Sequence, residues 1–346
     1  LLHDARCASL LRIMSITIPF GACHACICGY YYGLQRAGIP AAAHLVEQLI
    51  RVSAVYLIYR VALSEGRSLT PAAAVIGLVL GEFASMLFGL FSISAERPEK
   101  KTKKKRNYSL AALTRSMLAT AVPVTGNRVC MNLLSSAEAI LIPFTLQQYG
   151  LSAERALSVY GTLTGMSMSF ILFPNVLTNA VSVMLLPDMA QSQSLGNQER
   201  IDLTASRTVT CSLYLGILCT GLFLFYGADM GEILFSSTLA GSYITTLAWL
   251  CPFLYLSTTL GSILNGLGRT RATFIHNIAC LGTQLVFILV LVPLIGIQGY
   301  LYGLLFGELL LTLLHFAAVG RLAHISYDAF HHLLRPLGAL GIAAFL

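Results

Sequence analysis

The chain has 346 residues, of which 56% are hydrophobic and only 11% charged, and its formal net charge is +7. A soluble domain carries about a quarter charged residues, so this composition excludes a surface that is covered by water. It predicts an all-α polytopic membrane protein, because the strands of an outer-membrane barrel would alternate in polarity.

Nine apolar segments that are long enough to cross a bilayer follow one another along the chain. They cover residues 12–32, 40–63, 71–95, 117–145, 159–186, 208–226, 243–264, 273–293 and 300–320, and a tenth begins near 335. The linkers are short and contain glycine or proline, as at Gly38 and Pro40. We expect each segment to be a helix, because a helix satisfies its backbone hydrogen bonds internally.

Basic residues are distributed unevenly between the two ends of these segments. Every lysine lies in residues 100–105, between the third and fourth segments. If this loop is cytoplasmic, the same side receives Arg36, Arg200, Arg207, Arg269, Arg271, Arg321 and Arg335. The other side receives Arg6, Arg12, Arg67, Arg155, Asp229 and Glu232. The positive-inside rule therefore predicts a multi-pass protein of the bacterial cell membrane, with loop 96–112 in the cytoplasm beside anionic lipid head groups. The basic run lacks interleaved aromatic residues, so we expect no nucleic-acid partner.

Two short motifs occur in the same order on both sides of the basic loop. The sequence GLQR at 33–36 is matched by GLGR at 266–269, and GLVLGE at 77–82 is matched by GLLFGE at 303–308. An even number of segments separates the copies, which indicates a parallel repeat. The glutamates that end the second motif, Glu82 and Glu308, occupy matching positions, which favours a shared packing or capping role over ion coupling.

The repeat predicts two pseudo-symmetric helical lobes. We expect an incomplete N-lobe of three spans at 1–95, a basic cytoplasmic loop between the lobes at 96–112, a six-span C-lobe at 113–322, and the start of an additional C-terminal helix at 323–346. Relative to the C-lobe, the N-lobe lacks about three helices of ~20 residues plus their loops. The sequence leaves open whether the chain is a fragment without its first three helices or a genuine short protein.

Polar side chains inside the apolar segments are the functional candidates, because burying them in a bilayer is costly. In the second segment His44, Glu47, Gln48 and Arg51 share one helical face, and Glu47 and Arg51 are spaced for an i,i+4 ion pair. This face is either a self-neutralised pair that holds helices together or a gate or ligand contact.

The fourth segment carries a stripe of Arg128, Asn132, Ser135 and Glu138, at steps of four, three and three residues. An arginine near mid-membrane on such a stripe suits an anionic ligand, because a guanidinium binds phosphate through two parallel hydrogen bonds. The alternative is an intramembrane salt bridge of Arg128 with Glu138 or with another helix.

The fifth segment has a polar face that includes Asn175 and Asn179, and it contains Pro174. Proline removes a backbone donor, so we expect a kink at this point. A kinked polar helix is typical of a transport cavity, but a simple packing kink accounts for the pattern equally well.

Two stretches resemble a known family. Residues 29–52 read GYYYGLQRAGIPAAAHLVEQLIRV, and residues 160–190 read YGTLTGMSMSFILFPNVLTNAVSVMLLPDMA. The first resembles the polysaccharide-transporter branch of the MOP (MATE-like) superfamily, in which Gly-Tyr-x-x-Gly precedes a proline and Glu-Gln-x-x-Arg. The second is similar to the eighth helix of these proteins and, more distantly, to lipid II flippases. The resemblance implies a fold of two six-helix lobes with extra C-terminal helices, in which the ten segments are helices four to thirteen.

The resemblance also implies a function, which is the export or flipping of a lipid-linked oligosaccharide or polysaccharide precursor by alternating access, for the cell envelope or for sporulation. Arg128, aided by Arg51, would bind the pyrophosphate of a polyprenyl-linked sugar. The candidate cavity comprises Arg128, Asn132, Ser135, Glu138, Asn175, Asn179, Glu47 and Arg51. The partners would be this lipid-linked sugar and membrane lipids, and the sequence leaves a coupling ion, Na⁺ or H⁺, open.

Other functions are less consistent with the sequence. A cation-coupled multidrug exporter of the same superfamily is the alternative, and it would use the intramembrane carboxylates. The run CHACIC at 23–28 places Cys23, His24, Cys26 and Cys28 on different faces of a helix, so it predicts no metal site. The chain has no Walker loop, dinucleotide fingerprint, Gly-x-Ser-x-Gly elbow or zinc-protease helix, so we expect neither a cofactor nor an enzyme.

Overall fold

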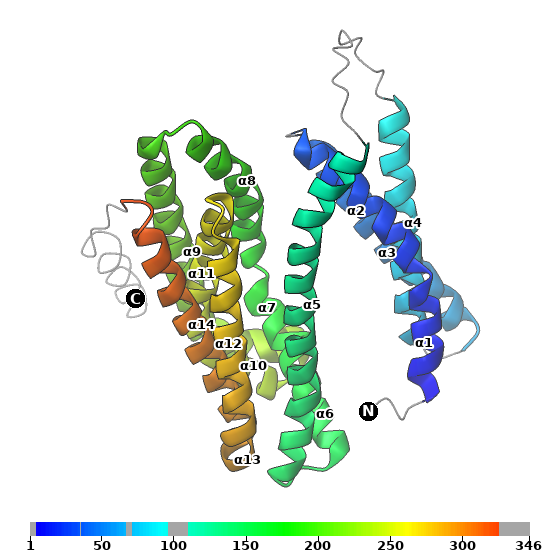
Figure 1. Ribbon diagram of the computed structural model, residues 1–346. Helices are drawn as coiled ribbons and strands as arrows, with labels where there is room; N and C mark the ends of the chain where they lie inside the picture. Colours follow the sequence, from blue (N-terminus) through cyan, green and yellow to red (C-terminus); the bar gives the residue numbers. More distant parts are fainter. Residues whose placement is uncertain (1–4, 35, 67–70, 96–109, 325–346) are drawn as a thin grey trace. The chain divides into compact units, whose positions relative to one another are not determined.

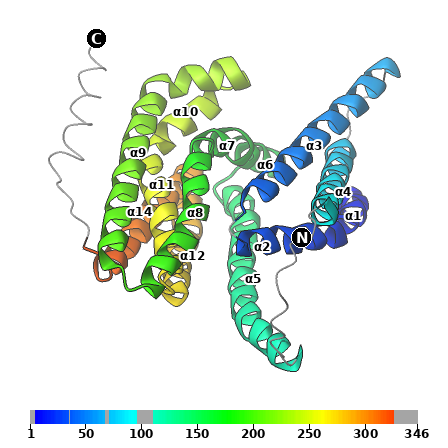
Figure 2. The same cartoon turned by 90° about the horizontal axis from the view of Figure 1, so that it is seen from above.

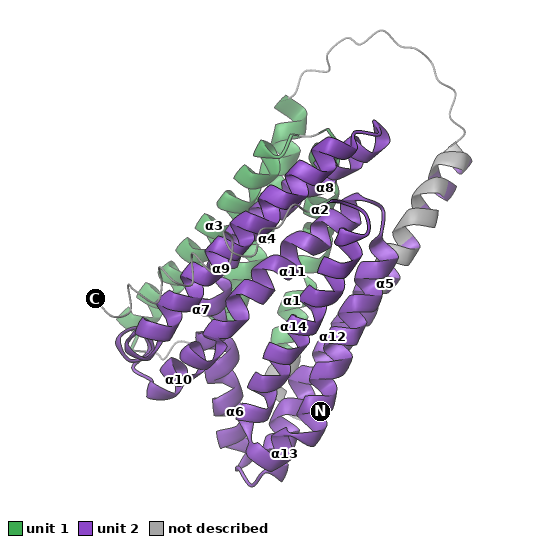
Figure 3. Ribbon diagram, turned by 90° about the vertical axis from the view of Figure 1, so that its left-hand side faces the viewer, with its two compact units in different colours: residues 1–108 green, residues 109–346 purple. Residues whose placement is uncertain are grey.

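The computed structural model describes residues 5–34, 36–66, 71–95 and 110–324, and within these ranges it contains helices and connecting turns but no strand (Figure 1). The basic run at 100–105 and the tenth predicted segment lie outside the described residues. The chain divides into two compact units, residues 1–108 and 109–346, which are coloured separately in Figure 3. Each unit is described below by itself.

The described residues of unit 1 form four helices: α1 (Ala5–Ser15), α2 (Thr17–Gly33), α3 (Gly38–Ser64) and α4 (Pro71–Ala95). The buried face of α4 carries a small residue at every fourth position, from Ala73 to Gly89. Small residues let helices approach closely in a membrane. A Cβ atom added at Gly77 would lie 2.5 Å from Cγ2 of Val55, so α3 packs directly against the backbone of α4.

Unit 2 contains the remaining helices. They are α5 (Leu110–Gln148), α6 (Ala153–Thr162), the π-helical turn η1 (Leu163–Ser167), α7 (Met168–Leu172), α8 (Asn175–Ser194), α9 (Gln198–Phe235), α10 (Thr238–Leu247), the 3₁₀ turn η2 (Ala248–Leu250), α11 (Cys251–Gly266), α12 (Thr270–Val290), α13 (Val292–Ile295) and α14 (Ile297–Gly320). Side chains of Ser152, Asn197 and Ser237 cap the N-termini of α6, α9 and α10. Helix α11 lies inside the bundle and contacts α8, α9, α12 and α14 (Figures 1 and 2).

The fifth predicted segment is bent, as Pro174 predicts. Residues 153–172 and 175–194 form two helical arms at 60° to each other. The hydroxyl of Tyr255 on α11 donates a hydrogen bond of 3.0 Å to the carbonyl of Ile171, immediately before the break. The bend therefore has a local cause in the proline and a tertiary support in α11.

The described helices agree with the nine predicted segments. Within the described residues, eight helices are long and apolar enough to cross a membrane, and the bent pair makes nine. The boundaries were less well predicted: α9 begins at Gln198, whereas the apolar segment begins at 208. The polar sequence QERIDLTASR still forms helix because Asn197 caps it, so hydropathy alone underestimates the length of α9.

The predicted repeat is visible in matching contacts inside the two units. A Cβ atom added at Gly81 of α4 would lie 3.3 Å from Cβ of Arg51 on α3, and one added at Gly307 of α14 would lie 2.9 Å from Cγ of Gln284 on α12. The spacing of the first repeated motif aligns Arg51 with Gln284, and the second motif aligns Gly81 with Gly307. The pair α3–α4 in unit 1 therefore packs like the pair α12–α14 in unit 2.

Candidate functional site

The predicted polar stripe lies on α5. Arg128, Asn132 and Ser135 are exposed, whereas Glu138 is 7% exposed. Neither an ion pair of Arg128 nor a hydrogen bond to Oε1 of Glu138 is found among the described residues. The alternative salt bridge between Arg128 and Glu138 therefore does not form, and the stripe combines an accessible guanidinium with a buried carboxylate about 15 Å further along the helix.

The helical rise places these residues at different depths. Arg128 lies 20 residues before Gln148, the end of α5, which is a distance of about 30 Å at 1.5 Å per residue. Glu138 lies about 15 Å from the same end by the same rise. If the Gln148 end marks one bilayer surface, Glu138 is near mid-membrane and Arg128 is close to the opposite boundary. In the predicted apolar segment 117–145 Arg128 lay near the middle, because that segment begins eleven residues before Arg128, whereas the candidate span of the structure begins at Arg128 itself.

The two asparagines of the fifth segment are not equivalent. Asn175 is 8% exposed, and its Oδ1 accepts hydrogen bonds from the hydroxyls of Thr178 and of Thr258 on α11, the latter at 3.4 Å. Asn179 is exposed. Asn175 thus helps α8 pack against α11, and only Asn179 presents a side chain that is accessible to a ligand.

The predicted polar face of α3 forms the expected ion pair. Arg51 Nη2 donates to Oε1 of Glu47, whose side chain is 7% exposed, and His44 Nδ1 lies 3.3 Å from the other oxygen, Oε2. Arg51 Nη1 also donates to Oε1 of Gln48 at 3.5 Å. Glu47 is therefore bound on both oxygens, as the self-neutralised alternative of the sequence analysis requires.

The matching glutamates of the repeat meet different partners. In unit 1, Oε2 of Glu82 lies 3.5 Å from Nδ1 of His24 on α2. In unit 2, the hydroxyl of Ser257 on α11 donates to Oε2 of Glu308 at 3.1 Å. The first repeated motif aligns His24 with Ser257. Each unit therefore places a polar side chain opposite the glutamate of the repeated motif, and this side chain is a histidine in unit 1 and a serine in unit 2.

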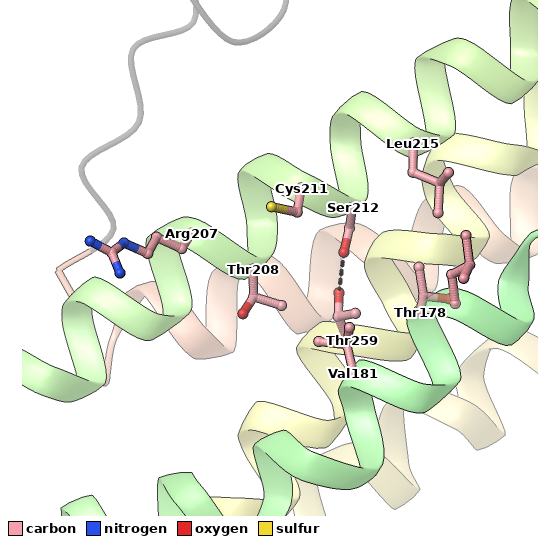
Figure 4. A pocket seen from close by; sticks show the side chains of 9 residues that line it. Thr178, Val181, Arg207, Thr208, Cys211, Ser212, Leu215 and Thr259 are labelled. Carbon is pink, nitrogen blue, oxygen red and sulfur yellow. Dashed lines mark hydrogen bonds between the residues drawn. The ribbon is translucent and has the colours of Figure 1, made fainter.

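Unit 2 also contains a pocket that the sequence analysis missed. A cavity of about 280 Å³ lies between α8, α9 and α11, with Leu177, Val181 and Leu215 on its apolar side (Figure 4). The exposed Arg207 lies at one end of the cavity. A hydrogen bond of 3.1 Å between the hydroxyls of Ser212 on α9 and Thr259 on α11 forms part of its lining (Figure 4). A guanidinium beside an apolar hollow suits an amphipathic anion. The sequence analysis used Arg207 only for topology.

Known proteins were compared with the chain. No family model matches it. The chain is 25% identical to Stage V sporulation protein B of Bacillus subtilis (strain 168) over 94% of its own length and 64% of that protein. It is 20% identical to Sporulation protein YkvU of the same strain, over 86% of its own length and 67% of that protein. It therefore spans about two thirds of the length of either relative.

Solved structures show the same fold. The inward closed conformation of the lipid II flippase MurJ aligns with a TM-score of 0.71 and 13% identity, over 97% of this chain and 68% of that one. An outward-facing multidrug resistance MATE family transporter of the MOP superfamily aligns with a TM-score of 0.65 and 14% identity, over 85% of this chain and 64% of that one. The predicted all-α fold is confirmed, and the expected resemblance to the MOP superfamily is confirmed as a likeness of fold.

Proposed function

We propose that this protein is a membrane flippase for a lipid-linked oligosaccharide or polysaccharide precursor, and that it works by alternating access. The similarity to a sporulation protein along nearly the whole chain and the fold shared with a lipid II flippase support the proposal. The observation that carries it is Arg128, an exposed arginine without an ion-pair partner among the described residues, on a helix that crosses the bilayer. Such a cation needs an anion, and a phosphate of the cargo would supply it.

The geometry of α5 suggests how cargo would bind. The guanidinium of Arg128 would hold the pyrophosphate near one end of the span, and Asn132 and Ser135 would offer hydrogen bonds to sugar hydroxyls about 6 and 10 Å further along the helix. Asn179 on α8 is accessible for the same purpose. The partners would be the lipid-linked sugar and membrane lipids of a bacterial cytoplasmic membrane, and a Na⁺ or H⁺ gradient would supply the driving force.

The test is a flipping assay on the full-length gene product in liposomes. A fluorescent disaccharide on polyprenyl pyrophosphate is placed in the inner leaflet, and its appearance outside is followed with a quencher that cannot cross the bilayer. Arg128→Ala should slow flipping roughly 10- to 100-fold, because hydrogen bonds to a charged group contribute about 1.5–3 kcal/mol. Arg128→Lys should retain part of the rate.

The matched control is Arg115→Ala, which removes an exposed arginine from the same helix. It should leave the rate unchanged. Equal rates for Arg128→Ala and the unmodified protein would contradict the assigned role of Arg128. Ion-driven efflux of a cationic dye, together with no flipping of any lipid-linked sugar, would favour the multidrug exporter instead.

A further inference from the structure

Unit 1 brings together five side chains of the kinds that bind metal ions. They come from three helices: His24 and Cys28 from α2, His44 and Glu47 from α3, and Glu82 from α4. The ligand atoms of His24, Glu47 and Glu82 lie within 4.8 Å of one another. His24 and Glu47 are each 5% exposed and are shielded by the packing of the three helices, whereas the side chain of Glu82 is 23% exposed and that of His44 is 57% exposed.

The hydrogen bonds around His24 determine which nitrogen faces the carboxylates. The hydroxyl of Ser85 on α4 lies 3.2 Å from the carbonyl of Ala43 and 2.9 Å from Nε2 of His24, and when its single proton goes to the carbonyl its oxygen accepts from Nε2. In a neutral imidazole the proton is then on Nε2, and Nδ1 carries a lone pair. This is the arrangement in which a histidine binds a metal through one nitrogen while the other is held by a hydrogen bond.

That lone pair is directed towards another acceptor. Nδ1 of His24 lies 3.5 Å from Oε2 of Glu82, and this oxygen is buried and receives no hydrogen bond from the described residues. In this tautomer the two acceptors repel each other unless a cation lies between them, whereas a proton on Nδ1 would turn the contact into an attraction. The balance of formal charges also favours a cation, because Glu47 and Glu82 are two acidic residues and Arg51 is one basic residue. A buried excess of negative charge in an apolar bundle is costly, so an additional cation would stabilise the cluster.

We propose that His24, Glu47 and Glu82 bind a divalent transition-metal ion, for which Zn²⁺ is the best fit. Zinc bonds to nitrogen and carboxylate oxygen are about 2.0–2.1 Å long, which gives distances of roughly 3.3–3.4 Å between neighbouring ligand atoms of a tetrahedral site. The 3.5 Å between His24 and Glu82 is close to this value, and small side-chain rotations would bring Glu47 to the same separation. Histidine together with carboxylates favours Zn²⁺ or Co²⁺ over Mg²⁺ or Ca²⁺.

The residues around this trio support the same role. Arg51 binds one oxygen of Glu47, and His44 lies 3.3 Å from the other, so the carboxylate is oriented by both neighbours. A bound ion would connect α2, α3 and α4, which otherwise meet mainly through small apolar residues. It would act within unit 1, and its absence would leave the flippase proposal intact.

Unit 2 provides a built-in control. Glu308 occupies the position that matches Glu82, but Ser257 stands where His24 would be, and its hydroxyl donates to the carboxylate. No group of three potential ligands is found among the described residues of unit 2. The site is therefore expected only in unit 1, although both units share the same helix packing.

The experiment uses the full-length gene product in detergent, purified without a polyhistidine tag and stripped of metal with a chelator. Co²⁺ is titrated and followed by its visible absorption, and Zn²⁺ is then added to displace it. We expect one ion per chain, and we expect His24→Gln and Glu82→Gln each to weaken binding by at least about 100-fold. Glu308→Gln and Cys23→Ser, which change the matched glutamate and an exposed thiol, should leave binding unchanged.

Three results would overturn the proposal. The first is a folded protein that binds neither Co²⁺ nor Zn²⁺ saturably, and the second is full binding by both His24→Gln and Glu82→Gln. The third is a thiolate-to-cobalt charge-transfer band that Cys28→Ser removes, because it would place the ion on His24, Cys28 and His44 instead. If the variants do not fold, thermal unfolding of the unmodified protein decides: Zn²⁺ should raise the unfolding temperature and Mg²⁺ should not, and no rise with Zn²⁺ refutes the site.

Discussion

A close helix contact in unit 2 offers a quantitative test of the packing. Helices α9 and α10 meet at Gly231 and Gly241, and a Cβ atom added at Gly231 would lie 2.2 Å from both Cα and N of Gly241. The shortest ordinary contact is 3.4 Å, so Gly231→Ala requires the two backbones to separate by about 1.2 Å. Only Ser236 and Ser237 connect these helices, and Ser236 is already in the left-handed conformation, so the connection cannot easily absorb this shift.

The expected cost combines two opposing terms. Overpacking costs roughly 1–3 kcal/mol, and a contact with backbone atoms belongs at the upper end of that range. Alanine recovers up to about 1 kcal/mol of helix propensity. The net loss is about 2 kcal/mol, which corresponds to a fall in unfolding temperature of roughly 4–8 °C for a unit of this size.

The assay is thermal unfolding in detergent, followed with a dye that becomes fluorescent on reaction with a thiol. Buried cysteines such as Cys219 and Cys251 become reactive only when unit 2 unfolds. The control is Gly282→Ala on α12, where an added Cβ meets nothing within 4 Å, so the same substitution should keep or raise the unfolding temperature. If Gly231→Ala unfolds at or above the temperature of Gly282→Ala, the argument from close backbone contact is wrong.

Two further substitutions test individual buried polar groups by thermal unfolding with the same dye, which reports on unit 1 through the buried Cys28. Tyr255→Phe leaves the buried carbonyl of Ile171 without the hydrogen bond from this hydroxyl and should cost about 1–3 kcal/mol of stability. Tyr243→Phe is the control and should be neutral, because the hydroxyl of Tyr243 has no partner among the described residues. Equal losses of stability in the two variants would contradict the role of the Tyr255 hydrogen bond. Arg51→Met removes the cation that binds Oε1 of the buried Glu47, leaves the carboxylate with His44 beside its other oxygen, and should cost up to about 3–5 kcal/mol, and adding Glu47→Gln should restore most of it. No recovery in the double variant would show that Arg51 stabilises the fold through packing instead.

The overall fold was predictable because it follows from the solvent. Apolar runs of about 20 residues must become helices in a bilayer, and Pro174 must interrupt one of them, whatever the rest of the protein does. The repeated glycines at 81 and 307 could be paired from the sequence because close helix approach in a membrane requires small residues at fixed positions. The start of α9 was missed because a capped polar helix has no hydropathy signal.

The candidate site was only partly predictable. The stripe from Arg128 to Glu138 and the pair of Glu47 with Arg51 are local features, since residues three or four apart share one face of any helix. Which of these side chains is accessible depends on neighbouring helices. Asn175 and Asn179 are the same residue type, four positions apart on one helix. The hydroxyl of Thr258 nevertheless donates a hydrogen bond to Asn175, whereas Asn179 is exposed.

The sequence by itself determined that this is a polytopic helical membrane protein with repeated lobes, because periodicity, apolar length and charge asymmetry are properties of short segments. Only the tertiary structure decided what His24 does. In the run CHACIC, Cys28 shares the helix face of His24 but Cys23 and Cys26 point in other directions, so the run alone offers too few ligands for a metal ion. Packing of α2 against α3 and α4 brings Glu47 and Glu82 beside it, from positions 23 and 58 residues further along the chain. A contact between side chains so far apart in the sequence depends on how the helices cross, and that is set by the glycines of α4 rather than by the residues that meet.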